Sequence, residues 1–187
     1  MKKIHMVDLQ TQYKFIKTNV DAGIEQVLNS AQFINGPAVK SFQKNLESYL
    51  GVKNVIPCAN GTDALQIAMM GLGLKPGDEV ITADFTYAST VEVIALLGLT
   101  PVLVDVDPIT FNINPESIEK AITKKTKAIV PVHLFGQVAQ MEKIMQIAKK
   151  HGIFIIEDNA QALGANFTYS NGNKVKAGCI GDIGTTS

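Results

Sequence analysis

The sequence predicts an α/β fold, in which a mostly parallel sheet carries helices on both faces. The first observation is that short apolar runs alternate with amphipathic helical patterns from residue 55 onward, the βαβα order of parallel sheets. The second is that the segments between them are short, as compact α/β units require. The third is an apolar content of 46% in 187 residues, enough to cover a sheet on both faces within one domain.

Two helices are expected before this alternation begins. Apolar residues recur at helical spacing between residues 15 and 28, namely Phe15, Ile16, Val20, Ile24, Val27 and Leu28. After a loop, Pro37 is well placed for the first turn of a second helix, which ends near Leu50 and Gly51. We therefore divide the chain into an N-terminal helix and loop over residues 1–36 and an α/β core over residues 37–187.

The core is expected to alternate between strands and helices. Strands are predicted at residues 55–56, 79–82, 101–106, 128–132 and 153–157, and helices at residues 63–72, 88–97, 115–122 and 141–151. From residue 167 the pattern becomes polar, which predicts a β-hairpin around Asn171 and Gly172. The sequence then stops at Ser187 in mid-pattern, so we interpret residues 1–187 as a large domain truncated before its end.

Composition argues against several classes of protein. Basic and acidic residues number 17 each, and every basic residue is Lys, so the chain has no Arg and no basic cluster for nucleic acid. The histidines and the two cysteines lack metal-ligand spacing, and we expect no metal. No signal peptide and no membrane-spanning apolar run is visible, so we expect a cytoplasmic protein with no nucleic-acid or membrane partner.

The most informative residue is Asp158. It follows Glu157 at the end of the apolar run Ile153–Ile156, and the carboxyl ends of parallel strands open onto the ligand crevice. An N-cap or a buried ion pair is the simpler explanation, but no Arg exists to pair with this carboxylate. A cationic ligand atom, such as a protonated pyridine nitrogen, would supply the partner. His133 directly follows the preceding predicted strand, and its role, catalytic or structural, stays open.

Two further turns lie at the same edge of the predicted sheet. At residues 60–63, Gly61 permits close backbone approach and Thr62 is a natural N-cap, so this helix N-terminus is a candidate phosphate-binding turn. Taken alone, an ordinary capped helix explains the turn better. Phe85 and Tyr87 follow the next strand, where an aromatic could either stack on a flat ring or cap the core.

Two nucleotide-binding folds are excluded. The glycines between residues 71 and 77 follow a helix rather than a strand, and their last member comes one position late for a dinucleotide-binding turn. The chain also lacks the GxxxxGK[ST] pattern of a P-loop. The acidic pair at residues 157–158 therefore does not belong to either fold.

Six short segments gain meaning when they are taken in order: Asn60–Leu65, Gly77–Ile81, Phe85–Tyr87, Pro131–Gly136, Ile156–Gln161 and Gly181–Gly184. Each is modest alone. Together they closely resemble the DegT/DnrJ/StrS family of sugar-nucleotide aminotransferases, which depend on pyridoxal 5′-phosphate. The resemblance runs from Val7 to Ser187 and implies the large domain of an aspartate-aminotransferase-like (fold type I) enzyme.

The resemblance implies a phosphate-binding group and a ring-binding group. For the cofactor phosphate, it points to the turn that contains Gly61, Thr62 and Asp63, and to Ser187.

For the pyridine ring, the resemblance implies that Tyr87 stacks on one face and that Gln161 lies near the ring hydroxyl. Asp158 would hold the ring nitrogen, as the catalytic partner of the cofactor. The family also works as a homodimer with shared active sites, and its large apolar interface would suit this composition.

The implied reaction is amino transfer, from glutamate to a keto group of a nucleotide-linked sugar, in surface-polysaccharide or modified-sugar synthesis. Residues 8–10 and 58–67 favour members that aminate carbon 3. The family's Schiff-base lysine lies a few residues beyond the matching Ser, so we expect these 187 residues alone to be inactive and to lack the small C-terminal domain. Two alternatives stay open: a sugar dehydratase of the same fold, with His at the lysine position, and a non-catalytic cofactor-binding homologue.

Overall fold

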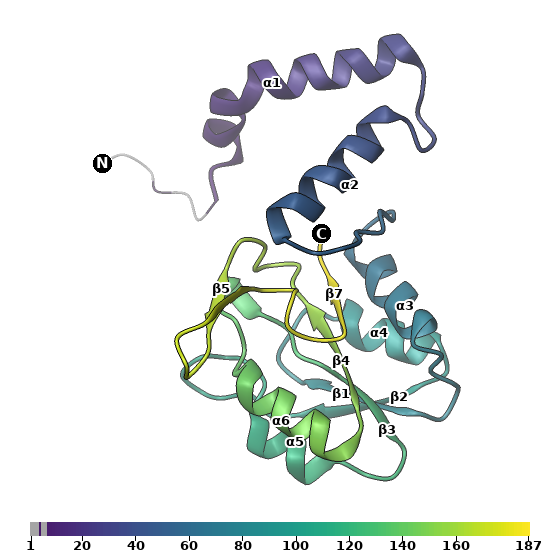
Figure 1. The fold of residues 1–187 in the computed structure, drawn as a ribbon, viewed down its shortest axis with the longest axis vertical. Coiled ribbons are helices and arrows are strands. Elements are labelled where there is room, and N and C mark those ends of the chain that lie inside the picture. The colour runs from purple at the N-terminus through teal and green to yellow at the C-terminus, as the bar shows by residue number, and fades with distance from the viewer. Residues whose placement is uncertain (1–3, 5–6) are drawn as a thin grey trace. The chain divides into compact units, whose positions relative to one another are not determined.

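The computed structural model describes residue 4 and residues 7–187, which form two compact units (Figure 1). The first unit ends at Pro57 and the second runs from Cys58 to Ser187. The first contains α1 (Leu9–Ser30) and α2 (Pro37–Leu50). Asp8 caps α1 by accepting a hydrogen bond from the Thr11 amide, and Pro37 occupies the first turn of α2. Both predicted helices are confirmed, and α1 extends beyond its predicted range at each end.

The second unit is built on a five-stranded sheet in which every pair of neighbouring strands is parallel. In spatial order the strands are β2 (Thr100–Val104), β1 (Glu79–Ala83), β3 (Thr126–Val130), β4 (Phe154–Asp158) and β7 (Ile183–Thr185). The intervening helices are α3 (Gly61–Gly71), α4 (Ser89–Leu96), α5 (Pro115–Ala121) and α6 (Met141–His151), with a 3₁₀ turn, η1, at Leu134–Gly136. The predicted α/β class is confirmed.

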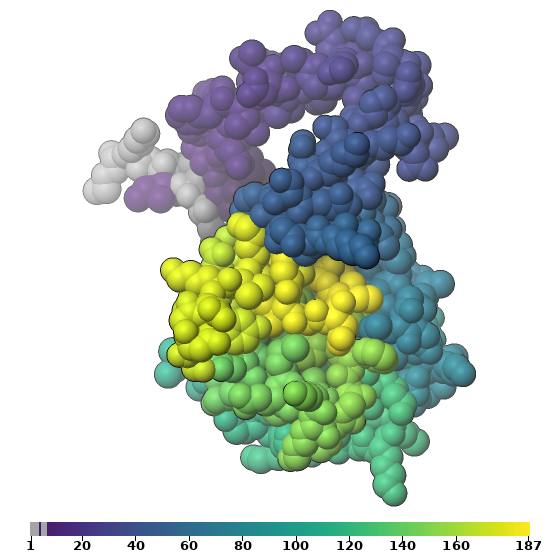
Figure 2. Space-filling view, in the orientation of Figure 1, coloured from purple at the N-terminus to yellow at the C-terminus, as the bar shows by residue number. Residues whose placement is uncertain are grey.

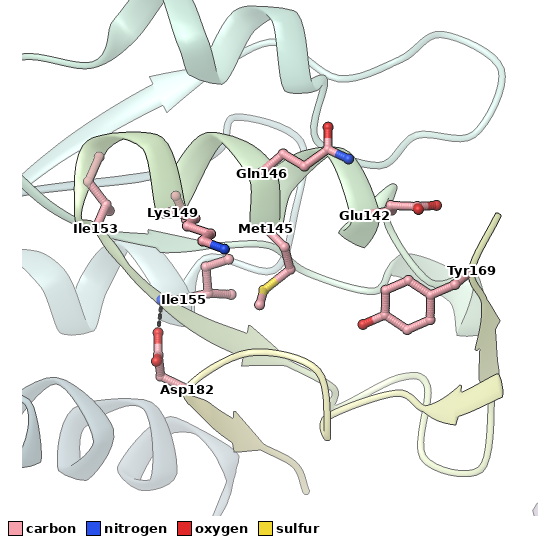
Figure 3. Close-up of a pocket in the computed structure, with 9 residues that line it drawn as sticks. Glu142, Met145, Gln146, Lys149, Ile153, Ile155, Tyr169 and Asp182 are labelled. Carbon is pink, nitrogen blue, oxygen red and sulfur yellow. Dashed lines mark hydrogen bonds between the residues drawn. The ribbon is translucent and has the colours of Figure 1, made fainter. Parts of the chain in front are cut away.

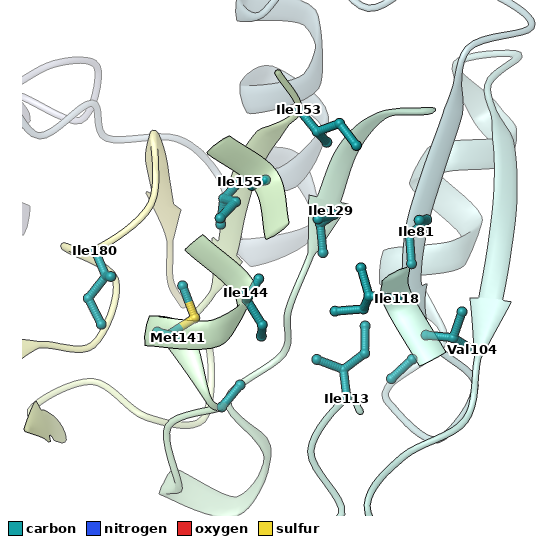
Figure 4. Packing of buried hydrophobic residues seen from close by; sticks show 13 residues of the cluster. Ile81, Val104, Ile113, Ile118, Ile129, Met141, Ile144, Ile153, Ile155 and Ile180 are labelled. Atoms are coloured by element: carbon teal, nitrogen blue, oxygen red, sulfur yellow. The ribbon is translucent and has the colours of Figure 1, made fainter. Parts of the chain in front are cut away.

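Successive strand residues point into two separate hydrophobic cores, one on each face of the sheet. In β4, Ile155 packs into a cluster with residues of α5 and α6, whereas Ile156 packs with residues of α3 and α4. Figure 4 shows the first cluster, where Ile129 and Ile155 from the sheet meet Ile118 and Ile144 from the helices. This alternation is why β3 and β4 carry consecutive apolar residues, at positions 128–130 and 154–156, since both faces of the sheet are covered by helices.

Two strand assignments differ from the sequence prediction. Residues 55–56 do not form a strand; the amide of Val55 donates instead to the Glu47 carboxylate, and Ile56 is exposed. The prediction was wrong because two apolar residues are too few to establish a strand without a neighbouring ladder. Conversely, the sequence prediction missed β7, which pairs with β4 at the edge of the sheet.

The predicted hairpin is present. It consists of β5 (Asn166–Thr168) and β6 (Lys174–Lys176), which pair antiparallel, and Gly172 supplies the positive φ that the turn requires. Its yellow-green and yellow atoms form part of the surface of the second unit (Figure 2). Within the part of the chain that the structure describes, no helix could span a bilayer and no cluster of potential ligands suits a metal ion.

Candidate functional site

A cavity of about 360 Å³ opens in the second unit at the carboxyl ends of the central strands. Its walls come from the starts of α3 and α4, from the ends of β3 and β4 with the segments that follow them, and from Ser187, two residues after β7. The lining residues are Asn60, Gly61, Thr62, Leu65, Tyr87, Ser89, Val132, Asp158, Ala160, Gln161 and Ser187. Six of the seven residues singled out from the sequence are in this set. The seventh, Asp63, is not; its carboxylate accepts a hydrogen bond from the Asn60 side chain.

Asp158, the last residue of β4, is 6% exposed and borders the cavity. Its Oδ2 accepts a hydrogen bond of 2.9 Å from the Thr90 hydroxyl, and its Oδ1 accepts one of 3.2 Å from the Ala160 amide. Neither donor carries a charge, and no Lys or His in the described part of the chain forms an ion pair with this carboxylate. The carboxylate is therefore oriented by neutral groups and remains available to a cation in the cavity.

The N-terminus of α3 forms another wall of the cavity. The sequence suggested Thr62 as the N-cap, but the cap is Asn60, whose Oδ1 accepts a 2.9 Å hydrogen bond from the Asp63 amide. This correction leaves Thr62 exposed and facing the cavity. An eleven-residue helix that starts at a cavity presents its first amides and the positive end of its dipole there, which favours an anion.

Gly61 and Ser187 meet at close range beside that helix terminus. A β-carbon placed on Gly61 would lie 2.8 Å from the Ser187 β-carbon and 3.3 Å from its Oγ. No side chain fits between them, so the absence of one at Gly61 lets the Ser187 hydroxyl approach the first turn of α3. The two segments lie more than a hundred residues apart in sequence and converge because β7 points at the start of α3.

The two aromatic residues that follow β1, Phe85 and Tyr87, have different surroundings. Phe85 packs against Phe111 with ring centroids 5.6 Å apart, which ties it to the surface of the fold. Tyr87 borders the cavity and is 71% exposed, so its ring has an open face. Of the two, Tyr87 is the aromatic placed to stack on a ligand.

Gln161 is held by a backbone group that the sequence did not reveal. The Phe135 amide donates a 2.7 Å hydrogen bond to Gln161 Oε1. Because a backbone amide can only donate, the oxygen of this side chain is fixed on the Phe135 side, and its NH₂ group remains available as a donor. Phe135 adopts φ 55°, a left-handed conformation that is costly for a large residue and that Gly136 follows with φ 87°.

His133 does not reach the cavity. It is fully buried, its Nδ1 accepts a 3.3 Å hydrogen bond from the Ala139 amide, and its Nε2 lies 2.8 Å from the Glu157 carboxylate. With Nδ1 as the acceptor, Nε2 carries the proton and donates it to Glu157. The question that the sequence left open is answered in favour of a structural role.

Glu157 is the partner that explains this burial. Desolvation alone would raise its pKa, but hydrogen bonds from His133 and from the Gly181 and Ile180 amides outweigh that effect and hold the pKa below its usual value. The adjacent carboxylates of Glu157 and Asp158 thus have different surroundings. One is saturated with donors inside the protein, and the other borders the cavity.

A second cavity, of about 430 Å³, lies against the other face of β4, beneath α6 and the hairpin (Figure 3). Glu142 and Asp182 contribute its carboxylates, which already accept hydrogen bonds from Ser170 and from the Ile155 amide. None of the residues singled out from the sequence lines it. Although it is the larger of the two, it lacks the convergence of an oriented acid, a helix terminus and an open aromatic.

Comparison with known proteins identifies the fold and its lineage. Residues 14–187 match the model of the DegT/DnrJ/EryC1/StrS aminotransferase family. The chain belongs to this family. Among curated members, the UDP-2-acetamido-2-deoxy-3-oxo-D-glucuronate aminotransferase of Pseudomonas aeruginosa is 52% identical over 164 residues, or 88% of this chain and 46% of that protein. The pleiotropic regulatory protein of Geobacillus stearothermophilus is 46% identical over 184 residues, 98% of this chain and 47% of that protein.

Solved structures of DegT/DnrJ/EryC1/StrS proteins share the fold. A family aminotransferase from Brucella abortus superposes with a TM-score of 0.91 at 43% identity, covering 99% of this chain and 50% of that one. The NtdA protein of Bacillus subtilis, solved with bound cofactor PMP, gives a TM-score of 0.83 at 36% identity, covering 88% and 38% of the two chains. The fold-type-I architecture is confirmed. The chain spans about half the length of the curated relatives it matches.

Proposed function

We propose that this chain forms the cofactor site of a pyridoxal-phosphate-dependent aminotransferase. The amino group passes from glutamate to a keto group at carbon 3 of a nucleotide-linked sugar, in surface-polysaccharide or modified-sugar synthesis. Family membership supports the reaction type, and the name of the Pseudomonas aeruginosa relative specifies a 3-oxo nucleotide sugar. The relative solved with PMP supports the cofactor.

The observation that carries this proposal is the Asp158 carboxylate, buried at a cavity wall with only neutral partners. A protonated pyridine nitrogen supplies the missing cation. The other walls fit the rest of the cofactor, since the start of α3 and the Ser187 hydroxyl suit its phosphate and the open ring of Tyr87 suits its pyridine face. We include Thr62 and Asp63 in the phosphate turn, where Asp63 acts through its hydrogen bonds to Asn60.

The residues of this chain would divide the work of binding and orientation. Pyridoxal phosphate, when bound, supplies an electron sink for the carbon atom that exchanges the amino group. Asp158 keeps the proton on the ring nitrogen, because Thr90 and Ala160 fix the direction of its carboxylate. Gln161 presents its NH₂ group to an acceptor, and Tyr87 excludes water from one face of the ring.

We propose further that the protein acts in the cytoplasm as a homodimer with shared active sites, as the family resemblance implies. The exposed apolar side chains of α1 support a protein interface, since Phe15, Ile24 and Leu28 are each more than half exposed. Size-exclusion chromatography with light scattering tests this assembly. A monomer at working concentrations would contradict it.

The experiment that tests the function uses the complete gene product, with glutamate and a 3-oxo nucleotide sugar, and follows the product by mass spectrometry. Nitrogen in the product supports amino transfer. Loss of water without nitrogen supports the dehydratase, and cofactor binding without turnover supports the non-catalytic homologue.

Asp158→Asn is the matched variant for this assay. Asn keeps an oxygen for the Ala160 amide, and its NH₂ can donate to Thr90, so the fold should be unaffected. The charge is lost, and a hydrogen bond to a charged group contributes about 1.5–3 kcal/mol, so turnover should fall by about 10- to 100-fold or more. Unchanged turnover would remove Asp158 from the mechanism.

A further inference from the structure

Glu157 joins three separate segments of the second unit through one buried carboxylate. Its Oε1 accepts hydrogen bonds of 2.6 Å from the Ile180 amide and 2.7 Å from the Gly181 amide. Its Oε2 accepts bonds of 2.9 Å from the Gly178 amide and 2.8 Å from His133 Nε2. Glu157 is 0% exposed, and the hydrogen bonds from these four donors hold its carboxylate in place inside the fold.

The loop held by these amides is packed too closely for side chains. A β-carbon on Gly178 would lie 2.9 Å from Asn159 Nδ2, one on Gly181 would lie 2.7 Å from Ile155, and one on Gly184 would lie 1.9 Å from the Gly178 carbonyl oxygen. Gly178 also has φ +80°, which favours glycine. The loop can therefore approach β4 closely enough for its amides to surround the carboxylate.

This anchored loop leads directly into β7 and then to the cavity. In the ladder, Glu157 lies opposite Gly184 and Asp158 lies opposite Thr185. The Thr185 hydroxyl donates to the Glu157 carbonyl oxygen, and two residues later Ser187 reaches the wall beside Gly61. Because successive residues of a strand face opposite sides, β4 orients Asp158 toward the cavity and Glu157 toward the loop.

We propose that Glu157 is a positioning residue for the cavity. By holding the 178–181 loop, it fixes the position of β7, and β7 in turn fixes the position of Ser187 relative to Gly61 and Asp158. His133 supports it by donating from Nε2. The consequence for cofactor binding rests on the proposed function, whereas the mechanical coupling does not.

Glu157→Gln is the variant that isolates the carboxylate. Glutamine has nearly the same shape, but its NH₂ group must face either the Ile180 and Gly181 amides or the Gly178 amide and His133. In each orientation donors oppose donors, so part of the loop loses its anchor. Gly178→Ala is the second variant, since it displaces the same loop through Asn159 without changing any charge.

Hydrogen exchange on the complete protein, without added cofactor, measures the coupling. In both variants we expect faster exchange across residues 178–187 and at the first turn of α3, and unchanged exchange in α5. The control is Ile118→Val, which trims a fully buried side chain in α5 and should lower the melting temperature. Ile118 shares a core with Ile180 of the loop, but Figure 4 shows Ile144 lying between the two. Unchanged exchange at residues 183–187 and α3 in the Gln variant would overturn the proposal, even with a lowered melting temperature.

Binding of pyridoxal 5′-phosphate and of pyridoxal, followed by absorbance, measures the consequence for the cavity. The ratio of the two affinities reports the contribution of the phosphate end. We expect this ratio to fall by about tenfold in Glu157→Gln and to stay constant in Ile118→Val. A constant ratio in both would make Glu157 a stabilising residue only. If the unaltered protein bound neither compound, the proposed function would fail, and the exchange result would still decide the positioning role.

Discussion

Gly61→Ala should weaken cofactor binding without destabilising the fold. Gly61 is the first residue of α3, and the added β-carbon would lie 2.8 Å from that of Ser187. Ordinary contact begins at 3.4 Å, so Ser187 must move by about 0.6 Å. Because Ser187 belongs to neither hydrophobic core, the displacement can be accommodated without repacking a core.

Gly61→Ala is expected to raise or preserve the stability of the fold and to lower the affinity for the cofactor. Replacing Gly by Ala in a helix stabilises a protein by about 0.5–1 kcal/mol, because the unfolded chain loses freedom, so the melting temperature should stay constant or rise. A hydrogen bond to a charged phosphate contributes about 1.5–3 kcal/mol, and moving the Ser187 hydroxyl should forfeit much of one such bond. Affinity for pyridoxal phosphate should therefore fall by about tenfold.

The assay combines cofactor titration by absorbance with thermal melting of the cofactor-free protein, both on the complete gene product. Gly71→Ala is the matched control, since Gly71 ends the same helix and an added β-carbon there meets nothing within 4 Å. It should affect stability similarly and leave affinity unchanged. The reasoning is refuted if Gly61→Ala binds the cofactor as tightly as the unaltered protein, or if the two variants weaken binding equally.

Three further predictions concern stability and the turn beside Gln161. The pKa of the Glu157 carboxyl is lowered in the folded state, so the ionised carboxylate stabilises the fold fully above about pH 4.5. This stabilisation is lost as the pH falls through the lower pKa of the folded state. The difference in melting temperature between Glu157→Gln and the unaltered protein should therefore shrink below pH 4.5. Phe135→Gly should relieve the left-handed strain, of about 1–2 kcal/mol, while keeping the amide that donates to Gln161, so melting temperature should not fall and cofactor affinity should be unchanged. Ile129→Ala should cost about 2–5 kcal/mol in urea unfolding, whereas Ile109→Ala, at a residue 86% exposed, should cost less than about 0.5 kcal/mol.

The sequence was informative wherever an element was long enough to show a period. Helix α6 matches its predicted range of residues 141–151, and the apolar strands β1, β3 and β4 were found to within about two residues. Strand β7 escaped because Ile183–Thr185 is short and has Gly at its centre, so neither length nor alternation marks it. Its place in the sheet depends on pairing with β4, a tertiary contact that no local pattern encodes.

Several side chains that border the cavity had signals in the sequence, whereas the backbone groups that orient them had none. An acid at the end of a buried strand and a Gly at the start of a helix have sequence signals, and they led to Asp158 and Gly61. The amide of Phe135, which orients Gln161, has none, because every residue except proline carries the same group. The cap of α3 illustrates the same limit, since Asn60 and Thr62 are both good caps and the backbone conformation decides between them.

The adjacent acids of β4 show why local sequence alone underdetermines the site. Glu157 and Asp158 are neighbours with the same charge, and a strand necessarily sends them to opposite faces. What distinguishes them lies elsewhere: the 178–181 loop brings three amides to one carboxylate, and the cavity leaves the other facing open space. Exchanging the two residues would place the shorter acid out of reach of the loop and the longer acid in the cavity. The order Glu-Asp therefore suits both the structural anchor and the proposed cofactor partner.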